Sequence, residues 1–248
     1  MLLLPTGERL KGYFVTGSDT GLGKTAVAAA LCLLLRRRGT DAVPVKPVQT
    51  GVAPGEPGDL EHCLEVIGLR PDADDLALMN PCRFRLPASP HLAAEQENTV
   101  VDISLLEKCC RELAARHDML IVEGAGGLLA PLTREVTTLD FAARLGLPLI
   151  IVARAGLGTI NHSLLTVRAA REAGMDVACV VLNRSQSEPP GEDEKKIEAD
   201  NVRIIAKLGG VEVLGPLPHV PGAGEDVAAT RKLAAQLANI FPADSITL

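Results

Sequence analysis

The sequence predicts one α/β domain, in which a mostly parallel sheet is covered by helices on both faces. Short apolar runs rich in β-branched residues alternate with longer helix-forming segments, a pattern typical of parallel strands joined by helical crossovers. A chain of 248 residues fits a single domain of this class, and a hydrophobic content of 47% supplies a large core. We find no internal repeat or interdomain linker and therefore treat residues 1–248 as one unit.

The composition limits the classes of partner. There are 25 lysines and arginines against 31 aspartates and glutamates, and the net charge of −6 argues against a nucleic-acid-binding surface. The six cysteines lack metal-ligand spacing, and several lie in apolar patterns typical of buried, reduced thiols. Met1–Leu4 is too short for a signal-peptide core, and Ala26–Leu35 is too short to span a bilayer. We expect a cytoplasmic protein with no membrane or nucleic-acid partner.

A glycine-rich stretch, Gly17–Thr25, lies between a predicted strand and a predicted helix. The strand is Gly12–Thr16, and the helix covers residues 26–38, where a basic last turn precedes Gly39. Strand, glycine-rich turn, Gly-Lys-Thr and helix in this order are the context of a phosphate-binding loop. The alternative is an ordinary strand-to-helix turn, and the flanking elements favour the phosphate loop.

The residues of this loop have the chemical properties that phosphate binding requires. Glycines let backbone N–H groups curl around phosphate oxygens, and the helix N-terminus adds partial positive charge. Lys24 would reach the β- and γ-phosphates, and the Thr25 hydroxyl would bind Mg²⁺. One position departs from the usual pattern, because Ser18 stands where the first glycine is expected and Gly17 lies one residue earlier.

The next candidate residues are Lys46 and Asp59. Lys46 ends the predicted strand that begins at Asp41, and the carboxyl end of a parallel strand faces the ligand crevice of an open α/β sheet. The alternative is a solvated lysine at a strand end. Asp59 opens a predicted helix that runs to Ile67, where it could simply cap the helix. Residues 80–87 are expected to be irregular, followed by a helix start at Ser89-Pro90-His91.

A carboxylate follows a buried strand in the middle of the chain. An amphipathic helix is predicted over Asp102–His117, and the apolar run Met119–Glu123 then ends in the acid. In nucleoside triphosphatases such an acid works through Mg²⁺. The small residues Gly124–Gly127 are expected to form a turn that lets a substrate approach the backbone. The alternative is a strand-end acid before a flexible turn.

The second half continues the alternation. A strand over Leu147–Val152 leads to the stretch 156–162 and a helix that ends near Ala173. Free N–H groups at that helix start suit a carboxylate, although Thr159 could merely cap the helix. The charged segment 185–200 is most simply a solvated helix face. The remaining predicted elements are the strands Val177–Leu182 and Val211–Leu214 and the helix Val227–Ile240.

Five motifs together resemble the dethiobiotin synthetase family. In chain order they are Gly17–Thr25, Lys46–Gly51, Ser89–His91, Val122–Gly127 and Thr159–His162. The resemblance covers essentially the whole chain from Gly12 to the last helix, and the shifted first glycine is normal for that family. It implies a single-domain fold like that of the P-loop nucleoside triphosphatases.

The resemblance also implies the penultimate, ring-forming step of biotin synthesis. The substrates would be 7,8-diaminopelargonate, CO₂ and ATP with Mg²⁺. One amine captures CO₂ as a carbamate, which attacks the γ-phosphate to give a carbamic–phosphoric anhydride. The second amine then closes the ring and releases phosphate. Because phosphorylation creates a good leaving group, the enzyme contributes mainly orientation and charge stabilisation.

The same resemblance implies roles for individual residues. Lys24 and Lys46 would act on the reacting groups as catalytic residues, with Lys46 in the active-site position. The Mg²⁺-linked positions are Thr25, Asp59 and Glu123. The nucleotide-binding positions are Gly21, Leu22, Gly23, Lys24, Thr25, Ala26, Asp59, Glu123, Gly124, Ala125, Gly126, Asn183, Arg184, Pro218, His219, Val220 and Glu225. The diamine-contacting positions are Thr20, Thr50, Thr159, Ile160 and Asn161, the last three contributed by the other subunit of a homodimer with shared active sites.

Other classes of protein have a similar loop. Partition or assembly ATPases carry a lysine at its beginning, whereas Gly17-Ser18-Asp19 contains none. Cobyrinate-type amidases would need an added glutaminase domain, for which 248 residues leave no room. A non-catalytic nucleotide-binding module would not require the full set of acids and lysines. We therefore expect a ligase, with a nucleotide-switch ATPase as the alternative.

Overall fold

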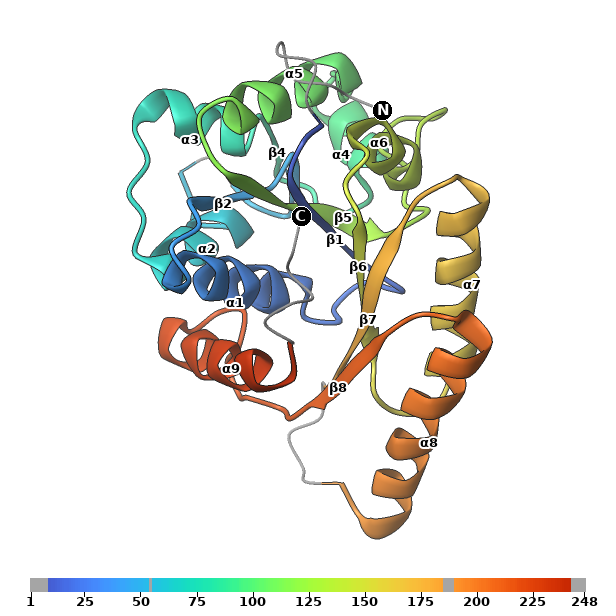
Figure 1. Ribbon diagram of the computed structural model, residues 1–248. Helices are drawn as coiled ribbons and strands as arrows, with labels where there is room; N and C mark the ends of the chain where they lie inside the picture. The colour runs from blue at the N-terminus through green and yellow to red at the C-terminus, as the bar shows by residue number, and fades with distance from the viewer. Residues whose placement is uncertain (1–8, 54, 185–189, 242–248) are drawn as a thin grey trace.

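A computed structural model describes residues 9–53, 55–184 and 190–241 of the chain (Figure 1). The short apolar run Met1–Leu4 and the first part of the charged segment, residues 185–189, lie outside the described residues. Within the described ranges, none of the helices has the length and apolar composition needed to cross a membrane.

A six-stranded parallel sheet forms the centre of the fold. Its strand order is β2-β5-β1-β6-β7-β8, and every neighbouring pair is parallel. The strands are β1 (Gly12–Gly17), β2 (Ala42–Val45), β5 (Met119–Gly127), β6 (Leu149–Arg154), β7 (Val177–Asn183) and β8 (Val213–Leu217). The chain leaves β1 toward β2 on one side and later passes to β6 on the other. In open sheets of this kind, ligands bind at the carboxyl ends of the strands near such a switch point.

Helices cover both faces of this sheet, as predicted (Figure 1). One apolar cluster joins the sheet to α1 and α9, and the other joins it to α5, α6, α7 and α8. The helices are α1 (Lys24–Arg37), α2 (Asp59–Ile67), α3 (Ala73–Met79), α4 (Pro90–Gln96), α5 (Ile103–Ala114), α6 (Thr138–Leu145), α7 (Thr159–Glu172), α8 (Glu192–Gly209) and α9 (Val227–Ile240). The expected charged helix therefore exists as α8.

Strand β1 connects the two clusters. Its side chains alternate in direction, so Val15 packs beneath α1 while Phe14 packs on the opposite face. There the Phe14 ring meets Phe141 of α6 edge to face, with ring centroids 6.2 Å apart. Because β1 is buried throughout, it provides a fixed base for the loop that follows it.

All six cysteines are free, as expected, and all except the half-buried Cys82 are buried. Burial raises the pKa of both the Cys32 and Cys179 thiols to about 12. Thiols with such pKa values stay protonated at neutral pH.

Three local predictions differ from the structure. Residues 80–87 are not wholly irregular, because β4 (Cys82–Phe84) pairs with β3 (Val48–Thr50) in a separate two-stranded parallel sheet. The expected turn at Gly124–Gly127 is instead the end of β5, where Gly127 pairs with Gly17. Helices α3 and α6 were not predicted, although Thr137 and Asp140 form a capping box at the start of α6.

Candidate active site

The phosphate loop is held in place on two sides, by a backbone hydrogen bond to β6 and by a side-chain hydrogen bond from the end of β7. The Ser18 N–H donates to the Val152 carbonyl at 3.0 Å, and the Asn183 amide donates to the Leu22 carbonyl at 2.9 Å. Gly23, the N-cap of α1, has a φ of 86°, and a Cβ there would lie 2.5 Å from the Asn183 amide nitrogen. Only glycine fits this position without strain, and the first N–H groups of α1 have no helical partner at this end of the helix.

A cleft of about 380 Å³ opens beside this loop, at the carboxyl ends of β1, β2 and β5. Most of the predicted site residues line it, so the structure brings together segments far apart in the sequence. The lining residues are Thr20, Gly21, Leu22, Gly23, Lys24, Thr25, Ala26, Lys46, Val48, Gln49, Thr50, Asp59, Glu123, Ala125, Gly126, Ala223, Gly224 and Glu225.

Lys46 lies between two carboxylates at the bottom of the cleft. Its Nζ is 2.6 Å from Asp59 Oδ2 and 2.7 Å from Glu123 Oε1, and the lysine is only 5% exposed. Burial by itself would lower the pKa of Lys46, but the two adjacent carboxylates raise the pKa above its usual value. Lys46 is therefore a buried ammonium held between two acids and not a solvated strand-end lysine.

The two acids differ in their surroundings. Glu123 Oε1 also accepts a hydrogen bond from the Thr25 hydroxyl at 2.9 Å, and complete burial raises the pKa of Glu123 despite the neighbouring Lys46. Asp59 is more exposed to the cleft; burial opposes ionisation, but Lys46 lowers the pKa of Asp59 overall. Asp59 and Glu123 thus hold one ammonium group between them, and the Thr25 hydroxyl is bonded to the same Glu123 oxygen.

Asp59 is not the cap of its helix. The N-cap of α2 is Gly58, whose N–H donates to Glu61 Oε2 at 2.7 Å, and the N–H of Asp59 itself donates to the side-chain oxygen of Gln49. The carboxylate of Asp59 is turned instead toward Lys46. The structure therefore favours the site interpretation of Asp59 over the capping alternative.

Lys24 presents a second positive charge to the cleft. It is 7% exposed, and its Nζ donates to the Asp19 carbonyl at 3.2 Å. In the described part of the chain, no carboxylate lies within ion-pair distance of this Nζ. Burial lowers the pKa of Lys24. A buried ammonium without a carboxylate partner suits an anion that enters from the cleft.

The oxygen atoms of Thr25, Asp59 and Glu123 fit Mg²⁺ only if a phosphate also binds the ion. Among the described residues, no three histidine, cysteine, aspartate or glutamate side chains converge on one point. Mg²⁺ does not need such a group, since it prefers oxygen and usually binds one or two carboxylates together with water and substrate phosphates. Thr25, Asp59 and Glu123 supply hard oxygen atoms next to the phosphate loop, so the residues fit this ion.

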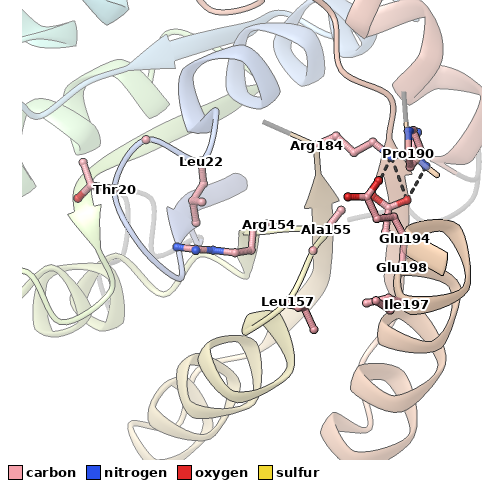
Figure 2. A pocket seen from close by; sticks show the side chains of 12 residues that line it. Thr20, Leu22, Arg154, Ala155, Leu157, Arg184, Pro190, Glu194, Ile197 and Glu198 are labelled. Atoms are coloured by element: carbon pink, nitrogen blue, oxygen red, sulfur yellow. Dashed lines mark hydrogen bonds and ion pairs between the residues drawn. The ribbon is translucent and has the colours of Figure 1, made fainter. Parts of the chain in front are cut away.

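A second cleft lies on the other side of the loop (Figure 2). It measures about 460 Å³ and shares Thr20, Gly21 and Leu22 with the first cleft. Figure 2 shows Arg154 reaching from the end of β6 toward the loop, where its Nη2 is 3.1 Å from Asp19 Oδ2. Across the cleft, Arg184 pairs with Glu198 of α8 at 2.6 Å.

Several predicted residues do not line the first cleft. Thr159, Ile160 and Asn161 begin α7, close to Gly156 and Leu157 of the second cleft. Thr159 does not cap this helix, because Gly158 is the N-cap and the buried Thr159 hydroxyl contacts Ser163 at 3.2 Å. The other predicted residues outside the first cleft are Gly124, Asn183, Arg184, Pro218, His219 and Val220.

The sequence interpretation missed four residues of the first cleft. Val48 and Gln49 belong to β3, and the Gln49 side-chain carbonyl accepts from the Asp59 N–H at 3.2 Å. Ala223 and Gly224 precede α9. The alternating glycines at positions 222 and 224 are the only local signal that could have indicated a backbone close to a ligand.

Comparison with known proteins identifies the family. A family model described as an AAA domain matches residues 11–226. ATP-dependent dethiobiotin synthetase BioD of Anaeromyxobacter dehalogenans (strain 2CP-C) is 45% identical over 212 residues, which cover 86% of this chain and 92% of that protein. The chain belongs to the dethiobiotin synthetase family. A more distant dethiobiotin synthetase, from Halalkalibacterium halodurans, is 34% identical and covers 86% of both chains.

Solved structures support the fold of this dethiobiotin synthetase family member. MinD in the Aquifex aeolicus MinC:MinD cell division complex has a TM-score of 0.57 at 17% identity, and the match covers 95% of this chain and 92% of that one. A ParA family ATPase from Chlorobium tepidum has a TM-score of 0.55 at 13% identity, with 94% and 99% covered. These identities are low, so the likeness concerns the fold alone.

Proposed function

We propose that this protein uses ATP to join CO₂ to 7,8-diaminopelargonate and closes the ring of dethiobiotin. The observation that carries the proposal is the position of Lys46, a charged ammonium fixed by two acids beside a phosphate loop. Family membership supports the same activity, since the relatives are named ATP-dependent dethiobiotin synthetases.

The chemistry needs two positive charges at different places. A carbamate formed on one amine attacks the γ-phosphate, the phosphoryl group moves to the carbamate oxygen, and ADP leaves. The second amine then attacks the carbonyl carbon, the C–O bond to phosphate breaks, and that amine loses its proton. Both lysines line the cleft; Lys24 would hold the phosphates, and Lys46 would hold the negative carbamate and phosphoryl oxygens during transfer.

The Mg²⁺ ion would be held by the phosphates together with Thr25, Asp59 and Glu123. When bound, it would neutralise charge on the phosphate oxygens. The residues of the chain meanwhile orient the reactants: Glu123 fixes both the Thr25 hydroxyl and the Lys46 ammonium through one oxygen atom. Thr20 and Thr50 lie on the wall of the same cleft, where they would contact the diamine.

The nucleotide-switch alternative lacks a supporting residue. Those ATPases carry a lysine at the beginning of the loop, where this chain has Asp19. The Asp19 carboxylate accepts a hydrogen bond from the Thr20 N–H at 2.7 Å and pairs with Arg154. Its partners therefore lie within the same chain. The loop therefore favours the ligase over a nucleotide switch.

We also propose that the active unit is a two-fold homodimer with shared active sites. Thr159, Ile160 and Asn161 lie outside the first cleft of their own chain, and their helix start suits the carboxylate of the substrate. Leu157, just before α7, is 78% exposed, and Leu165, within α7, is 57% exposed. Two-fold pairing is the commonest oligomer and would cover these leucines.

The activity itself is tested by phosphate release from ATP in the presence of Mg²⁺. We expect the diamine and bicarbonate together to stimulate release strongly, because neither alone forms the carbamate that attacks ATP. Lys24→Ala should abolish this turnover. Equal rates with and without the two substrates would contradict the proposed reaction.

Replacing Asp59 by asparagine should raise the Mg²⁺ concentration needed for half-maximal activity, since a neutral amide is a weaker ligand for the ion. Activity is measured across a Mg²⁺ titration. Glu61→Gln is the matched control, because Glu61 holds the Gly58 N–H at the same helix end. If Asp59→Asn changed only thermal stability, Asp59 would have no part in binding the ion.

Lys46→Ala should lower kcat by about 10²-fold or more, the scale on which a donor to a developing negative charge acts. Its KM for ATP should change little, because Lys24 and the loop backbone still hold the phosphates. Steady-state kinetics on protein shown to be folded by thermal denaturation give both values. A normal kcat with a raised KM would assign Lys46 to ATP binding instead.

Mixed dimers test the shared sites. A Lys24→Ala chain combined with an Asn161→Trp chain should recover part of the activity, since one pocket then receives both intact contributions. Activity is compared between each homodimer and the purified heterodimer. The claim fails if verified heterodimers show no recovery, or if sedimentation finds a fully active monomer.

A further inference from the structure

A buried polar bridge joins α2 to α9 beside the first cleft. His62 of α2 is 9% exposed, and Thr230 of α9 is fully buried. The His62 Nε2 lies 2.9 Å from the Thr230 hydroxyl oxygen. That oxygen also lies 2.9 Å from the Asp226 carbonyl and 2.9 Å from the Gly224 nitrogen. One hydroxyl group therefore has three polar contacts.

These contacts define the direction of each hydrogen bond. A hydroxyl has one hydrogen to donate and two lone pairs that accept. The Asp226 carbonyl can only accept and the Gly224 N–H can only donate, so all three contacts are satisfied only when His62 Nε2 carries the hydrogen. Burial lowers the pKa of His62, and the three contacts require the hydrogen on Nε2 whatever the charge of the ring.

The bridge connects two walls of the cleft. Gly224 lies in the segment Gly222–Glu225, of which Ala223, Gly224 and Glu225 line the first cleft. His62 lies one turn after Asp59 on α2, and Asp59 forms the ion pair with Lys46. The Thr230 hydroxyl thus links the segment before α9 to the helix that begins with Asp59.

We propose that Thr230 and His62 are positioning residues, which hold the Gly222–Glu225 segment at a fixed distance from Asp59 and thereby set the affinity for ATP. The inference rests on the proposed function, since it takes ATP to occupy the first cleft. Neither side chain lines that cleft, so the effect is transmitted through the Gly224 N–H and through α2.

A second contact between the same helices provides a matched control. Arg231, next to Thr230, donates from Nε to the Val66 carbonyl at 2.9 Å and from Nη2 to the Glu65 carbonyl at 3.2 Å. These carbonyls belong to the last turn of α2, at the opposite end from Asp59. Loss of Arg231 loosens the helix pair without touching the Gly224 N–H.

The test compares Thr230→Val with wild type. Valine has nearly the same shape but no hydroxyl, so the Gly224 N–H and the His62 Nε2–H lose their acceptor. We expect KM and Kd for ATP to rise about tenfold, the scale of one buried hydrogen bond left unmade. The kcat should stay within about twofold. Thr230→Ser should restore wild-type affinity because it returns the hydroxyl.

His62 gives a second, independent pair of variants should Thr230→Val fail to fold. His62→Gln keeps an N–H donor and should bind ATP almost normally, whereas His62→Leu should lose affinity as Thr230→Val does. Arg231→Met should lower the melting temperature but leave the KM for ATP unchanged. Steady-state kinetics, calorimetric titration with ATP and Mg²⁺, and thermal denaturation supply the three readouts.

The bridge would be purely structural, and the inference wrong, if Thr230→Val and His62→Leu lowered the melting temperature without changing ATP affinity. An equal loss of affinity in Arg231→Met would also overturn it, because any loosening of α2 against α9 would then suffice. If the wild-type protein bound no ATP at all, the proposed function itself would be wrong. Normal wild-type binding with unaltered variants would overturn the positioning role alone.

Discussion

The site depends on one constraint, which is that a single buried ammonium group pairs with two carboxylates, one buried and one partly exposed. Lys46 meets Asp59 and Glu123 at 2.6 and 2.7 Å, so moving any one of the three elements that carry them would leave a charge without its partner. Uncompensated buried charges cost several kcal/mol in real proteins, so separation of these groups would be strongly disfavoured. These two ion pairs thus tie the segment after β2 and strand β5 to the start of α2.

The order of the elements could be predicted because each prediction used a local signal. The strands before Gly17 and Glu123 are continuous apolar runs, and the helix after Lys24 has basic residues and a glycine at its end. Parallel pairing then brings the carboxyl ends together, so Lys24, Lys46 and Glu123 could be expected in one crevice. The prediction for residues 80–87 failed because β4 is too short to show a pattern. Strand β4 is defined by its pairing with β3, which the sequence does not show.

The rest of the site depends on contacts between distant segments, which a sequence cannot express. Asp59 could have been a helix cap, and only the Gly58 N–H held by Glu61 and the position of Lys46 decide between the two roles. Asn183 carries an obvious hydrogen-bonding group, yet its amide is used by the Leu22 carbonyl of the phosphate loop. The Thr230 hydroxyl shows the same limitation, since its partners come from α2 and from the segment before α9.

The distribution of cysteines has a consequence for how the motions of this molecule can be observed. The thiolate is the form that reacts with alkylating reagents, and burial both shields these thiols and keeps them protonated. Cys63 lies on α2 directly after His62, while Cys32 and Cys179 lie in α1 and β7. Modification of such a residue requires its surroundings to open first, so the rate of labelling at each position records how often that part of the core separates. The chain thus carries its own set of reporters, distributed from the cleft wall to the centre of the sheet.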